Sequence, residues 1–180
     1  MKHNVIKTAI LALLFSFVIS CKESEKDTEI KTIEDKSLHV MIEAIVPKND
    51  SFQIYWTEDG SDNFTPEKYI NIDIKGSNKP QLLDFKIPDE SIARQLRFDL
   101  GSNKEHVQIK LVSFKLKYMD KEFNCPIGEF WKYFGNNTSI EYDKNSAVAK
   151  LITNLPEGFD PIFGGTPNIT IELDKLYMNK

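Results

Sequence analysis

The sequence lacks the short motifs of the common enzyme classes. Its 180 residues contain no His-Glu-x-x-His, Gly-x-Ser-x-Gly, Walker or dinucleotide-binding pattern, which removes the usual basis for a metalloprotease, a serine hydrolase or a nucleotide-binding enzyme. A glycosidase needs only two carboxylates, and the 27 acidic residues leave that option open, although so small a domain has little room for a deep substrate cleft. We expect a protein that is not an enzyme.

No apolar run is long enough to cross a bilayer, which takes about 20 residues. The longest run covers residues 9–19 and follows a positively charged start that contains Lys2 and Lys7. A short apolar run behind positive charges is typical of a secretory signal peptide. The sequence therefore predicts a signal peptide at residues 1–20.

The end of this segment resembles a lipobox. Val18-Ile19-Ser20-Cys21 is similar to the cleavage site of bacterial lipoproteins, in which a small residue precedes a cysteine that is lipidated and becomes the mature N-terminus. The resemblance implies that Cys21 carries the lipid and that the protein is anchored in the outer membrane without crossing it. An ordinary secretory signal with an incidental cysteine is the alternative.

The residues after Cys21 are almost all charged or polar up to residue 36, which predicts a flexible tether at residues 21–36. Its acidic cluster resembles the export signal of some Bacteroidota surface lipoproteins, and a plain hydrophilic linker is the alternative. A periplasmic location and a cell-surface location are both compatible with the sequence. Without residues 1–20 the chain has 21 basic and 27 acidic residues, a formal charge of −6, which argues against nucleic acid as a partner.

Cysteine is scarce, which limits both disulfide and thiol chemistry. If Cys21 carries lipid, Cys125 has no partner for an internal disulfide. A catalytic thiol would need a nearby base, and neither His39 nor His106 lies in a recognisable nucleophile motif. We expect Cys125 to be packed in or near the core.

The remaining chain, residues 37–180, has the size of one domain and the period-two alternation of strands. The central stretch, residues 97–118, reads as a strand, a Gly-Ser-Asn turn and a second, longer strand. After Leu111 the apolar positions shift by one, to Phe114, Leu116 and Tyr118, which either turns the strand over or marks a bulge. Strands are expected at residues 38–46, 52–56, 70–74, 83–87, 96–100, 107–118, 122–124, 140–142, 147–152 and 169–173, a short helix at 127–134, and a long surface loop at 154–168.

Many short strands with frequent turns and almost no helix predict an all-β fold, an antiparallel two-sheet sandwich of jelly-roll type with one short helix. Residues 52–56 and 96–101, followed by residues 107–109, resemble the carbohydrate-binding jelly rolls of the galactose-binding-like superfamily. Together with the lipobox, the chain is similar to Bacteroidota envelope lipoproteins with such a domain. The resemblance implies carbohydrate as the ligand.

One candidate site is an acidic loop at residues 58–67. Glu58, Asp59, Asp62 and Asn63 could offer oxygen ligands to calcium, the only cofactor for which the sequence gives any indication. Their spacing is not that of an EF-hand. The other interpretation, which we favour, is a solvated turn around Asp59-Gly60 with Phe64 tucked into the core.

The second candidate site is aromatic. Tyr55 lies on the strand face opposite Phe52, Ile54 and Trp56, and Trp131 and Tyr133 lie in the short helix. Exposed rings stack on sugar faces, and Arg97 and Asp99 could bind the hydroxyl groups. The alternative is that these aromatic residues serve packing alone.

From these observations the sequence predicts a lipid-anchored envelope lipoprotein whose sandwich binds a ligand, with carbohydrate first, and performs no catalysis. The rival hypothesis is a structural accessory that packs against another envelope protein through an exposed apolar patch. A small glycan-acting enzyme is third, and would need two acids that converge in a pocket with displaced pKa values.

Overall fold

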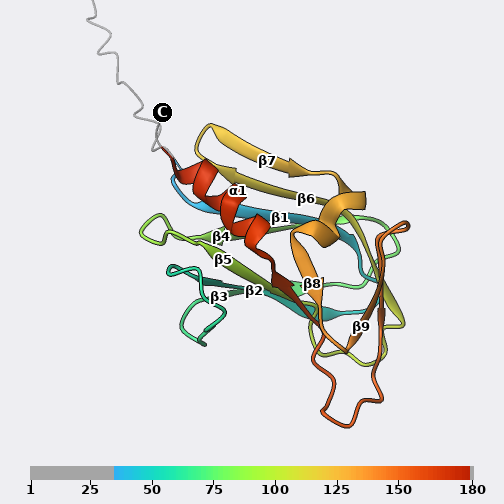
Figure 1. Cartoon of the computed structure of the whole chain (residues 1–180). Coiled ribbons are helices and arrows are strands. Elements are labelled where there is room, and N and C mark those ends of the chain that lie inside the picture. Colours follow the sequence, from blue (N-terminus) through green and yellow to red (C-terminus); the bar gives the residue numbers. More distant parts are fainter. Residues whose placement is uncertain (1–34, 179–180) are drawn as a thin grey trace, which may run out of the picture. The chain divides into compact units, whose positions relative to one another are not determined.

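The computed structural model describes residues 35–178, which form two antiparallel β-sheets packed face to face (Figure 1). The six-stranded sheet has the order β4-β1-β6-β10-β9, with β7 paired to β6, and the five-stranded sheet has the order β3-β2-β5-β11-β8. The two-sheet antiparallel sandwich is thereby confirmed, while its jelly-roll type and its likeness to galactose-binding domains stay predictions. The expected signal peptide, Cys21 and most of the expected tether lie outside the described residues.

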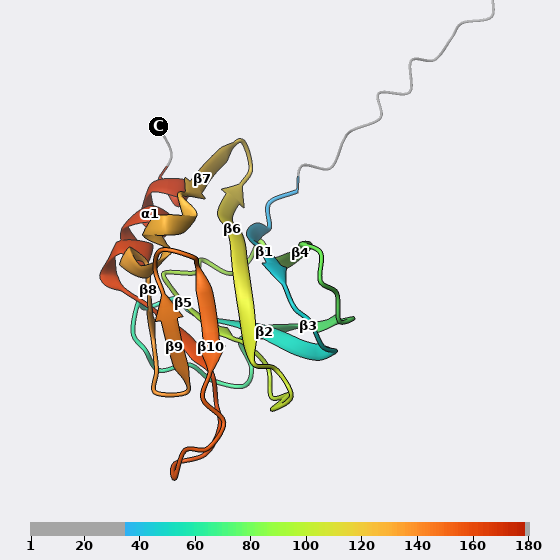
Figure 2. The ribbon, with the colours of Figure 1, turned by 90° about the vertical axis from the view of Figure 1, so that its right-hand side faces the viewer.

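The elements follow one another as β1 (Leu38–Ile45), β2 (Asp50–Thr57), β3 (Tyr69–Ile74), β4 (Gln81–Ile87), β5 (Gln95–Asp99), β6 (Gln108–Tyr118), β7 (Lys121–Cys125), the 3₁₀ helix η1 (Ile127–Lys132), β8 (Phe134–Asn136), β9 (Ile140–Asp143), β10 (Val148–Leu151), β11 (Ile162–Gly165) and the helix α1 (Pro167–Tyr177). Figure 2 shows β6, β10 and β9 side by side across one face. Within residues 35–178, no helix is both long and apolar enough to span a membrane.

A β-bulge explains the shift of apolar positions along β6. The register of β1 against β6 passes from Glu43 opposite Ser113 to Ala44 opposite Leu111, so Val112 is the extra residue. Because one residue is left over, Leu111 and Phe114 both point into the core although they are three positions apart. The bulge alternative of the sequence is confirmed.

The central stretch does not form a strand pair within one sheet. β5 pairs with β2 and β11, whereas β6 pairs with β1, β7 and β10 of the other sheet. The segment between β5 and β6 therefore crosses from one sheet to the other. Gly101 begins this crossing with a φ of +81°, a conformation that favours glycine.

The strand expected at residues 169–173 is wrong, because this segment belongs to α1. Thr166 caps the helix by accepting a hydrogen bond from the Asn168 N–H, and Pro167 occupies the first turn. Ile169, Leu173 and Leu176 are buried along one helical face, while Ile171, which the alternation placed with them, is exposed. The buried residues follow the i, i+4, i+7 spacing of one helical face, which the alternation of Ile169, Ile171 and Leu173 concealed, and the cap at Thr166 marks where the helix begins.

Two further segments differ from the expectation. The loop at residues 154–168 contains β11, which pairs with β5 on one side and β8 on the other. The short helix expected at residues 127–134 is the 3₁₀ helix η1, which ends at Lys132, and the last expected residue, Phe134, is the first residue of β8.

The core lies between the sheets and is rich in phenylalanine. Phe98 of β5 contacts Phe52 and Phe163 of its own sheet and Phe85 of the opposite sheet, at ring-centroid distances of 5.7, 6.5 and 6.2 Å. Cys125 is buried, as expected, and burial raises the pKa of its thiol to about 12. The side chain is therefore a neutral packing group and not a thiolate nucleophile.

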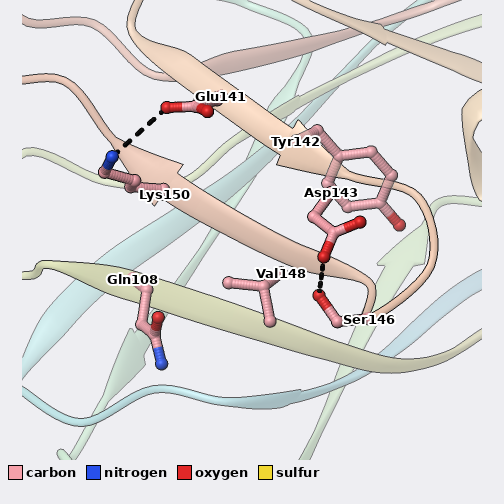
Figure 3. A pocket seen from close by; sticks show the side chains of 7 residues that line it. All are labelled: Gln108, Glu141, Tyr142, Asp143, Ser146, Val148 and Lys150. Atoms are coloured by element: carbon pink, nitrogen blue, oxygen red, sulfur yellow. Dashed lines mark hydrogen bonds and ion pairs between the residues drawn. The ribbon is translucent and has the colours of Figure 1, made fainter.

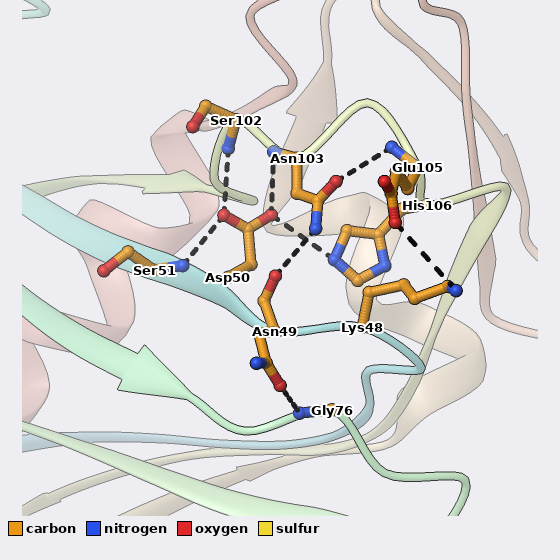
Figure 4. A network of polar contacts seen from close by, with 9 residues as sticks. All are labelled: Lys48, Asn49, Asp50, Ser51, Gly76, Ser102, Asn103, Glu105 and His106. Carbon is orange, nitrogen blue, oxygen red and sulfur yellow. Dashed lines mark hydrogen bonds and ion pairs between the residues drawn. The ribbon is translucent and has the colours of Figure 1, made fainter.

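A buried aspartate ties the β1–β2 turn to the crossing between the sheets (Figure 4). The Asp50 carboxylate accepts hydrogen bonds from the backbone N–H groups of Ser51, Ser102 and Asn103, at 2.8, 3.1 and 3.1 Å. The Asn103 amide in turn donates to the Asn49 carbonyl at 2.8 Å. The carboxylate thus occupies a nest of N–H donors that holds the end of β5 in place.

His106 is enclosed next to this carboxylate. Its side chain is fully buried, its Nε2 lies 3.4 Å from Asp50 Oδ2, and neither ring nitrogen has a hydrogen-bond partner among the described residues. Burial lowers the pKa of His106 below its usual 6.5, an effect that Lys48 reinforces and that Asp50 and Glu105 oppose.

We expect the folded state to lose stability as the pH falls from 7 to about 5. The unfolded chain takes up the His106 proton near pH 6.5 and the folded chain only at lower pH, so acidification favours unfolding in this window. Urea denaturation at several pH values measures the slope, and in His106→Gln the slope between pH 7 and 5 should be smaller. Equal slopes in both proteins would contradict this account.

Candidate functional site

The outer face of the five-stranded sheet carries a continuous row of residues from one edge to the other. Register places Tyr69 of β3 opposite Tyr55 of β2, Tyr55 opposite Arg97 of β5, Arg97 opposite Gly164 of β11, and Gly164 opposite Gly135 of β8. We call these five residues the cross-sheet row. Its four inter-strand spacings of about 4.8 Å make it roughly 19 Å long. The row faces away from the core, because the residues before and after Tyr55 on β2 and before and after Arg97 on β5 are buried and successive side chains of a strand point to opposite faces.

The first three members of the row form a stack. The rings of Tyr69 and Tyr55 are 5.2 Å apart and 22° from parallel, and the Arg97 guanidinium carbon lies 4.3 Å from the centre of the Tyr55 ring. Because β3 and β5 flank β2 on opposite sides, both faces of Tyr55 are covered. Tyr55 therefore holds Arg97 in place and offers no free ring face to a ligand. The ring that remains accessible is Tyr69, which is 41% exposed.

Arg97 is also fixed by Asp99, two residues along the same strand face. Its Nε and Nη2 donate to the two carboxylate oxygens at 2.8 and 2.6 Å. Burial raises the pKa of Asp99 above its usual value, against the opposing effect of Arg97, and the charge of Asp160 raises it further. The hydrogen bonds to Asp99 raise the pKa of Arg97. The result is a rigid ion pair that still has unused N–H donors.

The structure brings together Tyr55, Arg97 and Asp99 of the expected ligand-binding residues but places Trp131 and Tyr133 in other surroundings. The Trp131 indole N–H donates to the Gly128 carbonyl within η1, and Lys144 Nζ lies 4.0 Å from its ring centre. The Tyr133 ring packs against Phe123 of β7 at 5.0 Å. The two residues therefore do not extend the stack of the cross-sheet row.

The carboxylates of the acidic loop are engaged in local contacts. Glu58 pairs with Lys68 at 2.7 Å, and Asp59 accepts the Ser61 N–H at 2.9 Å, which lowers the pKa of Asp59. Glu58, Asp59 and Asn63 do line a depression of about 300 Å³. Asp62 is exposed to solvent. In residues 35–178, no three Asp, Glu, His or Cys side chains, Asp62 included, lie close enough together to hold a metal ion. The geometry favours the turn interpretation, and calcium binding stays a prediction.

Phe64 of the same loop is not in the core, where the sequence analysis placed it. Its ring is half-buried, and the Arg97 guanidinium lies 5.6 Å from its centre. The loop thus adds a second aromatic ring beside Arg97, at the border of the cross-sheet row.

A depression of about 300 Å³ lies on the six-stranded sheet near the β9–β10 turn (Figure 3). Its charged side chains all have partners: Lys150 donates to Glu141 at 3.3 Å, and Asp143 accepts a hydrogen bond from the Ser146 hydroxyl at 2.5 Å. Burial raises the pKa of Tyr142, which also lines it, to about 12.

Tyr69, Gly135 and Gly164 were missed by the sequence analysis. Tyr69 precedes the alternating isoleucines of its strand, and both glycines lie where glycine usually signals a turn or a loop. Tyr69 could have been found, because it directly precedes Ile70 and therefore lies on the strand face opposite the isoleucines. The glycines gave no such signal, because their neighbours come from distant parts of the chain.

Comparisons with known proteins give no relative from which the role of the cross-sheet row could be inferred. No protein-family model, no curated protein and no solved structure matches the chain.

Proposed function

We propose that the protein is a lipid-anchored lipoprotein of the bacterial envelope whose sandwich binds a glycan, without catalysis, on the cross-sheet row. The anchor is supported by the charged start, the short apolar run and the lipobox that ends at Cys21. The binding site is supported by the row itself, which places an exposed ring, an ion pair and bare backbone side by side on one sheet face.

The stack of Tyr69, Tyr55 and Arg97 is the observation that carries this proposal. These side chains are outside the core, and yet each is held by a neighbour, so they lose little conformational freedom when a ligand binds. The Tyr69 ring suits the C–H face of a sugar. Hydroxyl groups find donors on Arg97 and acceptors on Asp99 and Gln53, which lies opposite Asp99 on β2.

We expect Tyr69→Ala to weaken glycan binding about tenfold or more, because it removes the accessible ring and loosens the stack beneath it. The measurement is titration of the purified full-length protein against a broad glycan panel. Trp131→Ala is the matched control, since Trp131 is 40% exposed against 41% for Tyr69 and lies outside the row. It should bind as the wild type does.

Two results would contradict the proposal. If Trp131→Ala lowered the affinity and Tyr69→Ala did not, the site would lie at η1. If no glycan bound at all, the protein would be better described as an accessory that packs against another envelope protein, and a protein partner should then be sought.

A further inference from the structure

Two glycines lie next to each other at the end of the cross-sheet row. Gly164 of β11 is flanked by Arg97 on one side and by Gly135 of β8 on the other. All three positions point outward, so the sheet surface drops from the Arg97 side chain to bare backbone. We call Gly164 and Gly135 the glycine floor.

Neither glycine is required by the backbone or by packing. The described glycines with positive φ are Gly60, Gly101 and Gly158, so the glycine floor has ordinary strand conformation. A Cβ added to Gly164 or Gly135 would meet no described atom within 4 Å. Glycine weakens a strand interior, and where it is not needed for a turn or bulge it often marks the close approach of a ligand.

The adjacent Gly165 shows the contrast. A Cβ there would lie 2.7 Å from the Leu96 carbonyl oxygen and 2.1 Å from Gln95 Oε1, so the close approach of β5 requires glycine at this position. Folding therefore accounts for Gly165 and leaves Gly164 and Gly135 without a structural reason.

Arg97 forms the wall beside the glycine floor. Tyr55 covers the side of its guanidinium towards β2, and Asp99 takes two of its five N–H donors. Among the described residues, the Arg97 side chain makes no other hydrogen bond. Donors are thus left for oxygen atoms of a group that lies on the floor.

The charges around the floor do not favour an anion. The charge of Arg97 is balanced by Asp99, to which it is bonded. Asp160 adds a negative charge near the end of β5, where the Leu100 N–H donates to the Pro161 carbonyl at 2.9 Å. An acidic sugar would meet a net negative surface, while an uncharged sugar would not be repelled.

We infer that the glycine floor is a subsite for one uncharged sugar ring of the glycan. The ring lies flat against the backbone of β11 and β8, with its hydroxyl groups towards the N–H donors of Arg97. This inference rests on the proposed function and names the part of the ligand that reaches the far end of the row.

The test fills the floor with a side chain. Gly164→Val and Gly135→Val place a β-branched residue, which strands favour, into open space, so the thermal midpoint should stay the same or rise. Affinity of the full-length protein for neutral oligosaccharides of glucose, mannose, galactose or xylose should fall about tenfold or more. Gly128→Val is the matched control, because a Cβ at Gly128 of η1 also meets no described atom within 4 Å. The affinity of this variant for the same oligosaccharides should equal that of the wild type.

The outcomes separate this inference from the proposed function. If Gly164→Val binds neutral glycans as tightly as the wild type while Tyr69→Ala does not, the floor is not a subsite and the proposed function stands. Oligosaccharides of glucuronate or galacturonate that bind as tightly as neutral ones would overturn the assignment of an uncharged ring. If no glycan binds the wild type, both proposals fail. Should the valine variants unfold, Gly164→Ala gives the same test with a smaller side chain.

Discussion

Replacing Asp50 with alanine is expected to lower the free energy of unfolding by about 3–5 kcal/mol. The Asp50 side chain is 5% exposed, and its carboxylate accepts three backbone N–H groups that would lose their partner. A donor that water cannot reach costs about 1–3 kcal/mol when it loses its acceptor. The hydrogen bonds from Ser51 and Asn103 are part-buried and the one from Ser102 is exposed, so the first two account for most of an effect of this size. His106 would also lose the only carboxylate beside its ring among the described ion pairs.

The consequence should extend beyond stability. The hydrogen bonds from Ser102 and Asn103 to Asp50 hold the segment that follows β5, and Asp99 is the last residue of β5. We therefore expect glycan affinity to fall in Asp50→Ala even where the protein remains folded, because the ion pair of Arg97 and Asp99 loses its support.

Urea denaturation followed by tryptophan fluorescence measures the change in stability. Asp73→Ala is the control, since Asp73 is an exposed carboxylate that accepts hydrogen bonds from the Ser51 hydroxyl and the Asn71 amide. Its effect should be much smaller. A loss below about 1 kcal/mol in Asp50→Ala would show that water replaces the carboxylate in the nest and would contradict our account.

Phe98→Ala is expected to destabilise the protein by about 3–5 kcal/mol, the usual range for removing a buried aromatic ring. Phe98 is completely buried and contacts Phe52, Phe163 and, across the sandwich, Phe85. The remaining rings come from three strands in two sheets, so they cannot close the cavity without moving the sheets towards each other. The cost should therefore include the cavity as well as the lost transfer free energy.

Differential scanning calorimetry or urea denaturation will show this change. Val107→Ala serves as the control, because Val107 is 73% exposed and its truncation should change the stability by less than about 0.5 kcal/mol. If Phe98→Ala and Val107→Ala cost the same, Phe98 does not hold the two sheets together. Since Phe98 lies between Arg97 and Asp99 on β5, its loss should also disturb the cross-sheet row on the other face of the strand.

The two faces of β5 illustrate how the fold and the proposed site are connected. Leu96 and Phe98 point into the core and fix the position of the strand, while Arg97 and Asp99 point outward and form the ion pair. Period-two alternation made this division visible in the sequence. It did not show which residues of other strands lie beside Arg97.

Local patterns were sufficient for the class of fold. Alternation over most strands predicted the two-sheet sandwich, the shift after Leu111 left an inverted strand or a bulge as alternatives, of which the structure has the bulge, at Val112, and the isolated Cys125 is buried as expected. The sandwich and the shift follow from the direction of neighbouring side chains along one strand, which the sequence contains directly. The burial of Cys125 was expected because it has neither a disulfide partner nor a recognisable base. The signal segment and the lipobox at Cys21 are equally local, and the destination that they indicate stays a prediction.

Only the tertiary structure decided the composition of the cross-sheet row. Tyr69, Gly164 and Gly135 join Tyr55 and Arg97 because β3, β11 and β8 pair in register with strands that are remote in sequence. In the same way, residues 167–177 form a helix because Thr166 caps its start and Leu173 and Leu176 pack into the core. The alternation of Ile169, Ile171 and Leu173 had indicated a strand. Alternation fixes which face a side chain occupies, whereas its neighbours across the sheet are set by the register between strands, which depends on the whole fold.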